Sequence, residues 1–158
     1  MERIDSVLFV CLGNICRSPS AEAVFRYKAK QNGLDIRIDS AGMIANHSGQ
    51  APDKRSVAAG MKRGFDFSNM MARQVTQADF VDFDLILAAD KQNLADLTER
   101  CPEQYRAKLA LILDLDDNDK VQEVPDPYYG AGDGFERVLD LLELSCDSLV
   151  QRILKTKC

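Results

Sequence analysis

The sequence predicts a three-layer α/β/α sandwich. Short apolar runs alternate with helix-like segments along the chain of 158 residues. Such runs are typical of strands that are buried on both faces, and their alternation with helices is typical of a parallel sheet covered on each side. With 46% hydrophobic residues, the chain can bury one substantial core but hardly two. We therefore expect a single domain over residues 1–158.

The predicted elements follow one another without a linker or an internal repeat. Strands are expected at residues 7–10, 34–39, 85–88 and 109–113. Helices are expected at residues 18–32, 52–64, 76–80, 91–100 and 135–153. The second strand alternates apolar and charged residues, which indicates that it is less covered than the others. Ser18 suits the cap of the first helix, Pro19 its first position and Asn32-Gly33 its end.

Composition argues against several classes of partner. A formal charge of -5 and a pI near 4.9 give no general attraction for nucleic acid or an anionic membrane. No stretch approaches the roughly 20 apolar residues of a membrane span, and no cleavage-site pattern predicts export. The five cysteines are irregularly spaced, which indicates reduced thiols rather than a disulfide framework. We expect a cytoplasmic protein that binds no nucleic acid and no membrane.

The loop between the first predicted strand and the first predicted helix reads CLGNICRS, residues 11–18. Open α/β sheets bind ligands at the carboxyl ends of their strands. The amides of a tight loop and of the following helix N-terminus can converge there on an anion. Gly13 and Asn14 tolerate the left-handed backbone that such a turn requires. We therefore predict a phosphate-binding loop after the first strand.

This loop also contains a nucleophile. The positive helix end, the amide dipoles and the guanidinium of Arg17 all favour the thiolate form of Cys11. Arg17 offers a planar fork for two phosphate oxygens, and Ser18 can donate a hydrogen bond to the cysteine sulfur. Alone, Cys11 would more often be a small buried hydrophobe. The preceding strand and the Ser-Pro helix start favour the catalytic interpretation.

A second motif, VPDPYY at residues 124–129, places Asp126 between two prolines. A rigid loop can hold a carboxyl group in place as a proton donor for a phenolate leaving group, and then as a base for the attacking water. By itself this motif indicates only a turn, because Asp beside Pro is above all a turn signal. It gains meaning together with Cys11.

Together, VCLGNICRSPSAE at 10–22 and DPYY at 126–129 resemble the low-molecular-weight protein tyrosine phosphatases. The segments DSAG at 39–42, ARQV at 72–75 and FDLIL at 83–87 fall in the same order, so the resemblance covers nearly the whole chain. It implies a four-stranded parallel sheet and hydrolysis of phosphotyrosine and small aryl phosphates. It also implies no cofactor and no metal. The expected partners are tyrosine-phosphorylated proteins, with phosphate and other oxyanions as inhibitors and a monomer or weak self-association.

The resemblance also implies roles for individual residues. Cys11 matches the nucleophile, Arg17 the phosphate-binding arginine and Asp126 the general acid and base. Residues expected to contact the phosphate or the substrate are Leu12, Gly13, Asn14, Ile15, Cys16, Ser18, Tyr128 and Tyr129. Ser40 and Asp90 are expected to support the loop. Cys16 matches a residue that forms a reversible disulfide with the nucleophile under peroxide, which predicts redox regulation.

The sequence departs from the family at two places. The loop at 43–50 lacks the aromatic residue that many relatives place beside the active site, so its wall should be less aromatic. Upstream of Ala72, Met70 and Met71 stand where many relatives have a histidine in the supporting network. The only histidine, His47, is expected at the surface rather than in catalysis.

Two other activities occur on similar sequences. A thiol-dependent arsenate reductase would need two further cysteines close together, whereas Cys101, Cys146 and Cys158 are widely separated. Phosphoarginine phosphatases tend to have threonine where Ile15 stands, and isoleucine favours the tyrosine-directed branch. A non-catalytic anion-binding module is a third alternative.

Overall fold

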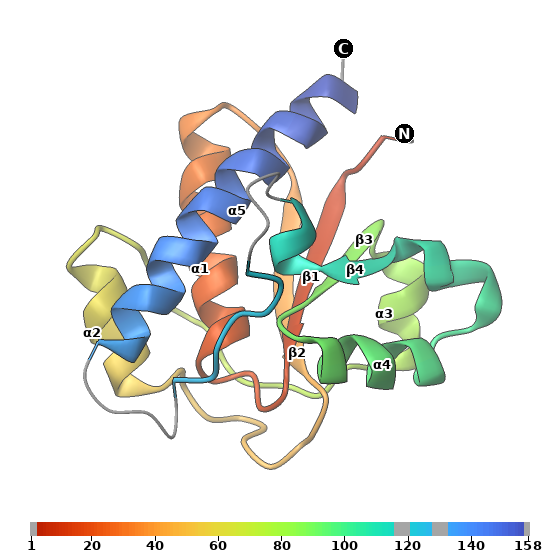
Figure 1. Cartoon of the computed structure of the whole chain (residues 1–158), viewed down its shortest axis with the longest axis horizontal. Helices are drawn as coiled ribbons and strands as arrows, with labels where there is room; N and C mark the ends of the chain where they lie inside the picture. The colour runs from red at the N-terminus through yellow and green to blue at the C-terminus, as the bar shows by residue number, and fades with distance from the viewer. Residues whose placement is uncertain (1–2, 116–120, 128–132, 157–158) are drawn as a thin grey trace.

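The computed structural model describes residues 3–115, 121–127 and 133–156. At its centre is a four-stranded parallel sheet in the order β2-β1-β3-β4 (Figure 1). The strands are β1 (Ser6–Cys11), β2 (Arg37–Gly42), β3 (Leu85–Ala88) and β4 (Leu109–Leu111). The helices are α1 (Arg17–Gln31), α2 (Lys54–Met61), α3 (Gln77–Asp82), α4 (Lys91–Arg100) and α5 (Gly134–Thr156), and 3-10 turns cover Glu103–Lys108 and Ile112–Leu115. The predicted fold class is confirmed.

Helices cover both faces of the sheet because alternate residues of β1 point to opposite sides. Val7 and Phe9 belong to an apolar cluster with residues of α1, α2 and α5. Leu8 and Val10 belong to a second cluster with residues of α3 and α4. Figure 1 shows these two groups of helices on either side of the strands. Within the described part of the chain, no helix is long and apolar enough to cross a membrane.

The connections make the carboxyl end of β1 a natural binding position. After β1 the chain passes through α1 to β2 on one side, and it later returns to β3 on the other side of β1. In the register of the sheet, Val10 lies beside both Ala41 of β2 and Ala88 of β3. Ligands of open α/β sheets bind at such a reversal of strand order. The loop at 11–18 starts there.

Three strands differ from their predicted ranges, and the first is only one residue longer at each end. The second begins at Arg37 instead of residue 34, because the backbone N–H of Leu34 donates to Ala29 and completes the end of α1. It also continues to Gly42, which pairs with Cys11. The fourth strand ends at Leu111, where a 3-10 turn begins.

Candidate active site

The loop after β1 folds back over the end of that strand. Cys11, the last residue of β1, and Arg17, the first residue of α1, are both almost fully buried. Asn14 has a left-handed φ of 58°, as predicted, and its backbone N–H points at Cys11 Sγ over 3.3 Å. Gly13 is not left-handed. A Cβ at this position would lie 2.9 Å from Cδ2 of His47, so a larger residue would displace that imidazole ring.

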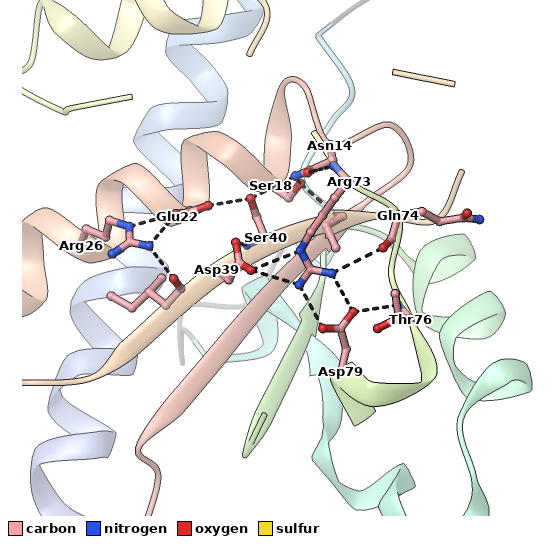
Figure 2. Close-up of polar contacts among 12 residues, drawn as sticks. Asn14, Ser18, Glu22, Arg26, Asp39, Ser40, Arg73, Gln74, Thr76 and Asp79 are labelled. Atoms are coloured by element: carbon pink, nitrogen blue, oxygen red, sulfur yellow. Dashed lines mark hydrogen bonds and ion pairs between the residues drawn. The ribbon is translucent and has the colours of Figure 1, made fainter. Parts of the chain in front are cut away.

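Side chains behind the loop connect it to β2 (Figure 2). Asn14 Nδ2 donates to Ser18 Oγ at 2.8 Å and to Ser40 Oγ at 3.0 Å. Ser18 Oγ lies 3.0 Å from Cys11 Sγ. The expectation that Ser18 caps α1 is wrong, because Cys16 occupies the cap position and no side chain caps the helix. The hydroxyl of Ser18 is turned toward the sulfur instead.

Arg17 joins the phosphate loop to the end of β3 and to the segment that carries Asp126. Its Nη1 donates to Asp90 Oδ2 at 2.7 Å and to Val124 O at 3.2 Å, and its Nη2 lies 3.6 Å from Asp126 Oδ2. Burial alone would lower the pKa of Arg17. Its interactions with Cys11, then Asp90 and Asp126, outweigh burial and raise this pKa above its ordinary value. The guanidinium therefore stays charged while its fork is held at the site.

Asp126 lies on a segment that is attached to the end of β3. The backbone N–H of Val124 donates to Ala89 O at 2.8 Å. Glu123 Oε2 accepts a hydrogen bond from the backbone N–H of Lys91, the first residue of α4, at 2.8 Å. The side chain of Asp126 is 35% exposed. This carboxyl group can therefore exchange protons with water while it faces the phosphate loop.

A pocket of about 130 Å³ opens over the nucleophile. It is lined by Cys11, Leu12, Gly13, Ile15, Cys16, Arg17, Ile44, Asn46, His47 and Asp126. Four of the predicted contact residues, Leu12, Gly13, Ile15 and Cys16, line this pocket. Asn14 and Ser18 lie behind the loop instead. The predicted contacts of Tyr128 and Tyr129 lie outside the described residues.

A larger cavity of about 870 Å³ lies between α1, β2 and residues 64–71. It contains neither Cys11 nor Arg17, so size does not mark the site. Chemistry does, because only the smaller pocket holds a thiol, a guanidinium and a carboxyl group together. Across the described ranges, no group of three or more His, Cys, Asp or Glu residues could hold a metal ion.

The wall formed by residues 43–50 differs in part from the prediction. His47 was expected at the surface, but it is partly buried and lines the pocket. Its Nδ1 lies 3.1 Å from Oε1 of Gln50. Ile44 and Asn46 complete this wall. The loop therefore contributes an imidazole ring and no phenyl, phenol or indole ring.

Cys16 is a second thiol of the same pocket. Burial is the main reason that its pKa is raised to about 12. Its environment differs from that of Cys11, which has Ser18 and the backbone N–H of Asn14 around its sulfur. At neutral pH Cys16 is therefore protonated.

Sequence reasoning missed Glu22, which is 5% exposed in the middle of α1. Its Oε1 accepts a hydrogen bond from Ser40 Oγ at 2.7 Å, and its Oε2 accepts one from Arg26 Nε at 2.9 Å (Figure 2). One signal was available in the sequence. A glutamate on the apolar face of a helix, four residues before an arginine, is a candidate for a buried ion pair.

Sequence reasoning also missed Arg73, which supports the loop from the other side of β2. Its backbone N–H donates to Asn14 Oδ1 at 3.1 Å. Its guanidinium pairs with Asp39 at 3.1 Å and with Asp79 at 2.9 Å (Figure 2). Burial alone would raise the pKa of Asp79, but the hydrogen bond from Arg73 outweighs it and lowers this pKa. No local pattern predicts this contact, because it joins distant segments.

Comparisons with known proteins agree with this geometry. The model of the family described as "Low molecular weight phosphotyrosine protein phosphatase" matches residues 6–158. The low molecular weight protein-tyrosine-phosphatase YfkJ of Bacillus subtilis is 41% identical, with 96% of this chain and 97% of the relative covered. The human low molecular weight phosphotyrosine protein phosphatase is 39% identical, with 93% and 94% covered.

Solved structures give the same result. A protein tyrosine phosphatase from Entamoeba histolytica matches with a TM-score of 0.92 and 43% identity, covering 97% of this chain and 99% of that one. The structure of YfkJ matches with a TM-score of 0.92 and 40% identity, covering 100% and 99%. The family match spans nearly the whole chain, including the loop and the acid segment. The chain therefore belongs to the low molecular weight phosphotyrosine protein phosphatase family.

Proposed function

We propose that this chain hydrolyses phosphotyrosine in proteins, and small aryl phosphates, through a phosphocysteine on Cys11. The observation that carries this proposal is the meeting of three groups in one small pocket. Cys11 Sγ has Ser18 Oγ at 3.0 Å, and Arg17 Nη2 lies 3.6 Å from Asp126 Oδ2 at the same pocket. A nucleophile, an anion-binding fork and a proton donor are the parts that this reaction needs.

In the first step the thiolate of Cys11 attacks phosphorus, while Arg17 and the loop amides bind the equatorial oxygens. Asp126 enters this step protonated and gives its proton to the phenolate as the bond to phosphorus breaks. In the second step the Asp126 carboxylate takes a proton from water, which attacks the phosphocysteine. The products are inorganic phosphate and the thiolate. Free phosphate and similar oxyanions should therefore inhibit by occupying the same loop.

An oxyanion-binding role has independent support. The Entamoeba histolytica relative has Hepes in its active site, and Hepes carries a sulfonate group. The pocket of this chain is small, about 130 Å³, which suits a single phosphate group with its ring at the mouth. We place Leu12, 41% exposed, and Ile15 against that ring. We also propose that Tyr128 and Tyr129 line the mouth.

We further propose that peroxide regulates the enzyme through Cys16. Peroxide would oxidise the thiolate of Cys11 to a sulfenic acid, and the thiol of Cys16 would then displace water to form a disulfide. The two thiols line one pocket, which supports this pairing. Four free cysteines among the described residues also suit a reducing, cytoplasmic location, which stays a proposal.

Residues 1–158 are proposed to act as one domain and as a monomer or a weak dimer. Both apolar clusters pack on the same sheet, so neither forms a separate core. An arsenate reductase would need two more thiols near the pocket. Cys101 and Cys146 are buried elsewhere, and burial raises the pKa of both. Ile15 in the pocket is the reason to prefer phosphotyrosine over phosphoarginine.

The test compares hydrolysis of para-nitrophenyl phosphate and a phosphotyrosine peptide by the wild type, Cys11→Ser and Cys101→Ser. Acid quenching traps any labelled phosphoenzyme. We expect turnover and label in the wild type and in Cys101→Ser, and neither in Cys11→Ser. An active Cys11→Ser variant, or a wild type that turns over only phosphoarginine or arsenate, would overturn the proposal.

A further inference from the structure

A chain of hydrogen bonds runs from the catalytic sulfur to the buried carboxylate of Glu22. Ser18 Oγ lies 3.0 Å from Cys11 Sγ, and Asn14 Nδ2 lies 2.8 Å from Ser18 Oγ and 3.0 Å from Ser40 Oγ. Ser40 Oγ lies 2.7 Å from Glu22 Oε1. All five residues are at most 6% exposed. Water therefore does not supply alternative partners, and Figure 2 shows the middle of this chain from Ser18 to Glu22.

The chain has a direction, which follows from what each group can donate. An ionised carboxylate only accepts, so Ser40 must give its single hydroxyl proton to Glu22. Ser40 can then only accept from Asn14. The amide of Asn14 cannot be flipped, because its Oδ1 accepts from the backbone N–H of Arg73 at 3.1 Å. Its Nδ2 therefore donates to both Ser18 Oγ and Ser40 Oγ.

The direction at Ser18 follows in turn. Since Asn14 Nδ2 donates to Ser18 Oγ, the hydroxyl proton of Ser18 is left for another acceptor. Two acceptors are near: Cys11 Sγ at 3.0 Å and the backbone oxygen of Ala41 at 3.4 Å. The sulfur is closer, and as a thiolate it is charged, which strengthens the bond. Ser18 therefore donates to the thiolate.

Arg26 supplies the counter-charge of Glu22. A buried carboxylate without a counter-charge would tend to bind a proton. Arg26 Nε donates to Glu22 Oε2 at 2.9 Å, and Arg26 Nη2 donates to Ile38 O at 2.5 Å. Without the Glu22 carboxylate as acceptor, the hydroxyl proton of Ser40 would compete with the N–H of Asn14 for the space between the two side chains, which would weaken the contact that holds the amide.

We propose that Glu22, paired with Arg26, is a positioning residue for Cys11. By accepting the proton of Ser40, it leaves the Ser40 oxygen to accept from Asn14 Nδ2 and so holds in place the amide that also donates to Ser18. Ser18 is thereby positioned to donate to the sulfur when the thiolate attacks and again when it leaves the phosphocysteine. The inference deepens the proposed function. What it says about the phosphocysteine rests on that function, whereas what it says about the attacking thiolate concerns only the reactivity of Cys11.

Other charges face these groups and stay in place when Glu22 or Arg26 is changed. Arg17 and Asp126 face Cys11 from the start of α1 and from the acid segment. Asp39 of β2 accepts from the backbone N–H of Ser40 at 2.8 Å, and it is paired with Arg73. Cys16 and His47 line the pocket as well.

The experiment uses the full chain and compares Glu22→Gln and Arg26→Met with Lys30→Met. Lys30 lies one turn beyond Arg26 on the same cavity wall, so its variant removes the same charge without touching the chain of hydrogen bonds. The first readout is the rate of Cys11 alkylation by iodoacetamide at fixed pH. We expect about a tenfold loss in Glu22→Gln, a smaller loss in Arg26→Met and no change in Lys30→Met.

The second readout separates positioning from a general loss of structure. With para-nitrophenyl phosphate, Glu22→Gln should lower kcat through slower breakdown of trapped phosphoenzyme. KM should fall in parallel because the phosphoenzyme accumulates, while the inhibition constant of phosphate changes less than twofold. Ser18→Ala should produce the same loss, and Glu22→Gln added to Ser18→Ala should cost nothing more, because the chain is already broken. Arg26→Lys should restore most of the loss seen in Arg26→Met.

Losses that add in the double variant, or a folded Glu22→Gln with wild-type alkylation, would overturn the inference. Arg26 is half exposed, so its variants provide the test if Glu22→Gln fails to fold. If the wild type hydrolysed no phosphate ester, the proposed function would fail while the alkylation series would still decide the inference.

Discussion

The phosphate loop and the acid segment face each other across one pocket, but they are held in different ways. The loop rests on buried side chains from α1, β2 and the segment around Arg73, and Asn14 alone makes contacts with Ser18, Ser40 and Arg73. The acid segment is attached mainly through Val124 and Glu123. Its catalytic side chain is 35% exposed.

This difference follows the chemistry that each side performs. Binding an anion through amides and a guanidinium requires fixed positions, because a small displacement loses several hydrogen bonds at once. A proton donor acts through one bond and must exchange its proton with water between the two steps. We therefore expect changes in the loop to slow formation of the phosphocysteine for every substrate, and changes in the acid segment to slow this step mainly for substrates with poor leaving groups.

The largest expected effect is that of Arg17→Lys. A lysine keeps the charge but loses the planar fork and the bridge between Asp90 and Val124. We expect kcat/KM to fall by about a thousandfold for good and poor leaving groups alike. Steady-state kinetics on a series of aryl phosphates measures this, with Arg63→Lys as the control at an ion-pair cluster on α5. A loss below tenfold would contradict the assigned role.

The next effect is that of Asp126→Asn, which cannot give or take a proton. We expect kcat/KM, which reports formation of the phosphocysteine, to fall by about a hundredfold for phenyl phosphate but only slightly for substrates with strongly acidic phenols. A plot of log kcat/KM against leaving-group pKa should therefore become steeper than in the wild type. A uniform loss across the series would place Asp126 with the binding groups instead.

The site was predictable where chemistry and chain order coincide. Cys11, Arg17 and Ser18 follow one strand within a single loop, so a buried strand and a helix start were enough to place them. The prediction of Asp126 rested on a weaker signal, because its motif alone indicates a turn. Even so, Arg17 reaches it across the ends of β1 and β3.

The supporting contacts were less predictable, since they depend on packing between distant segments. Arg73 reaches the loop only because Gly42 and Gln74 form a bridge beside β1 and β2. The position of His47 depends on the approach of its loop to Gly13. The start of β2 differs from its predicted position for a similar reason, because the backbone N–H of Leu34 bonds to Ala29 at the end of α1.

A third prediction concerns the support of the loop. In Asp79→Asn the guanidinium of Arg73 loses its more buried partner, so we expect the free energy of unfolding at pH 7 to fall by about 2 kcal/mol. The pKa of Asp79 is lowered in the folded state, so its stabilisation is present above the unfolded value of about 4 and is lost as pH falls further.

Urea titrations at several pH values measure the difference between wild type and Asp79→Asn. It should be constant from pH 7 to pH 5 and should shrink below about pH 4. Asp39→Asn is the matched control, because Asp39 pairs with the same arginine but its side chain is 41% exposed. Its effect should be smaller. A difference that grows at low pH would contradict the lowered pKa of Asp79 in the folded state.

The smallest expected effect is that of Glu123→Ala, which tests whether the acid segment depends on its contact with α4. The bond from Lys91 N to Glu123 is exposed, so its loss should lower kcat/KM only about threefold, and mainly for poor leaving groups. Glu103→Ala removes an exposed glutamate of the 3-10 turn before β4 and should change nothing. In the Asp126→Asn background, Glu123→Ala should have no further effect on kcat/KM, because Glu123 acts through the position of that carboxyl group. An equal loss in both backgrounds would mean that Glu123 stabilises α4 alone and that the acid segment is held by Val124 and Arg17.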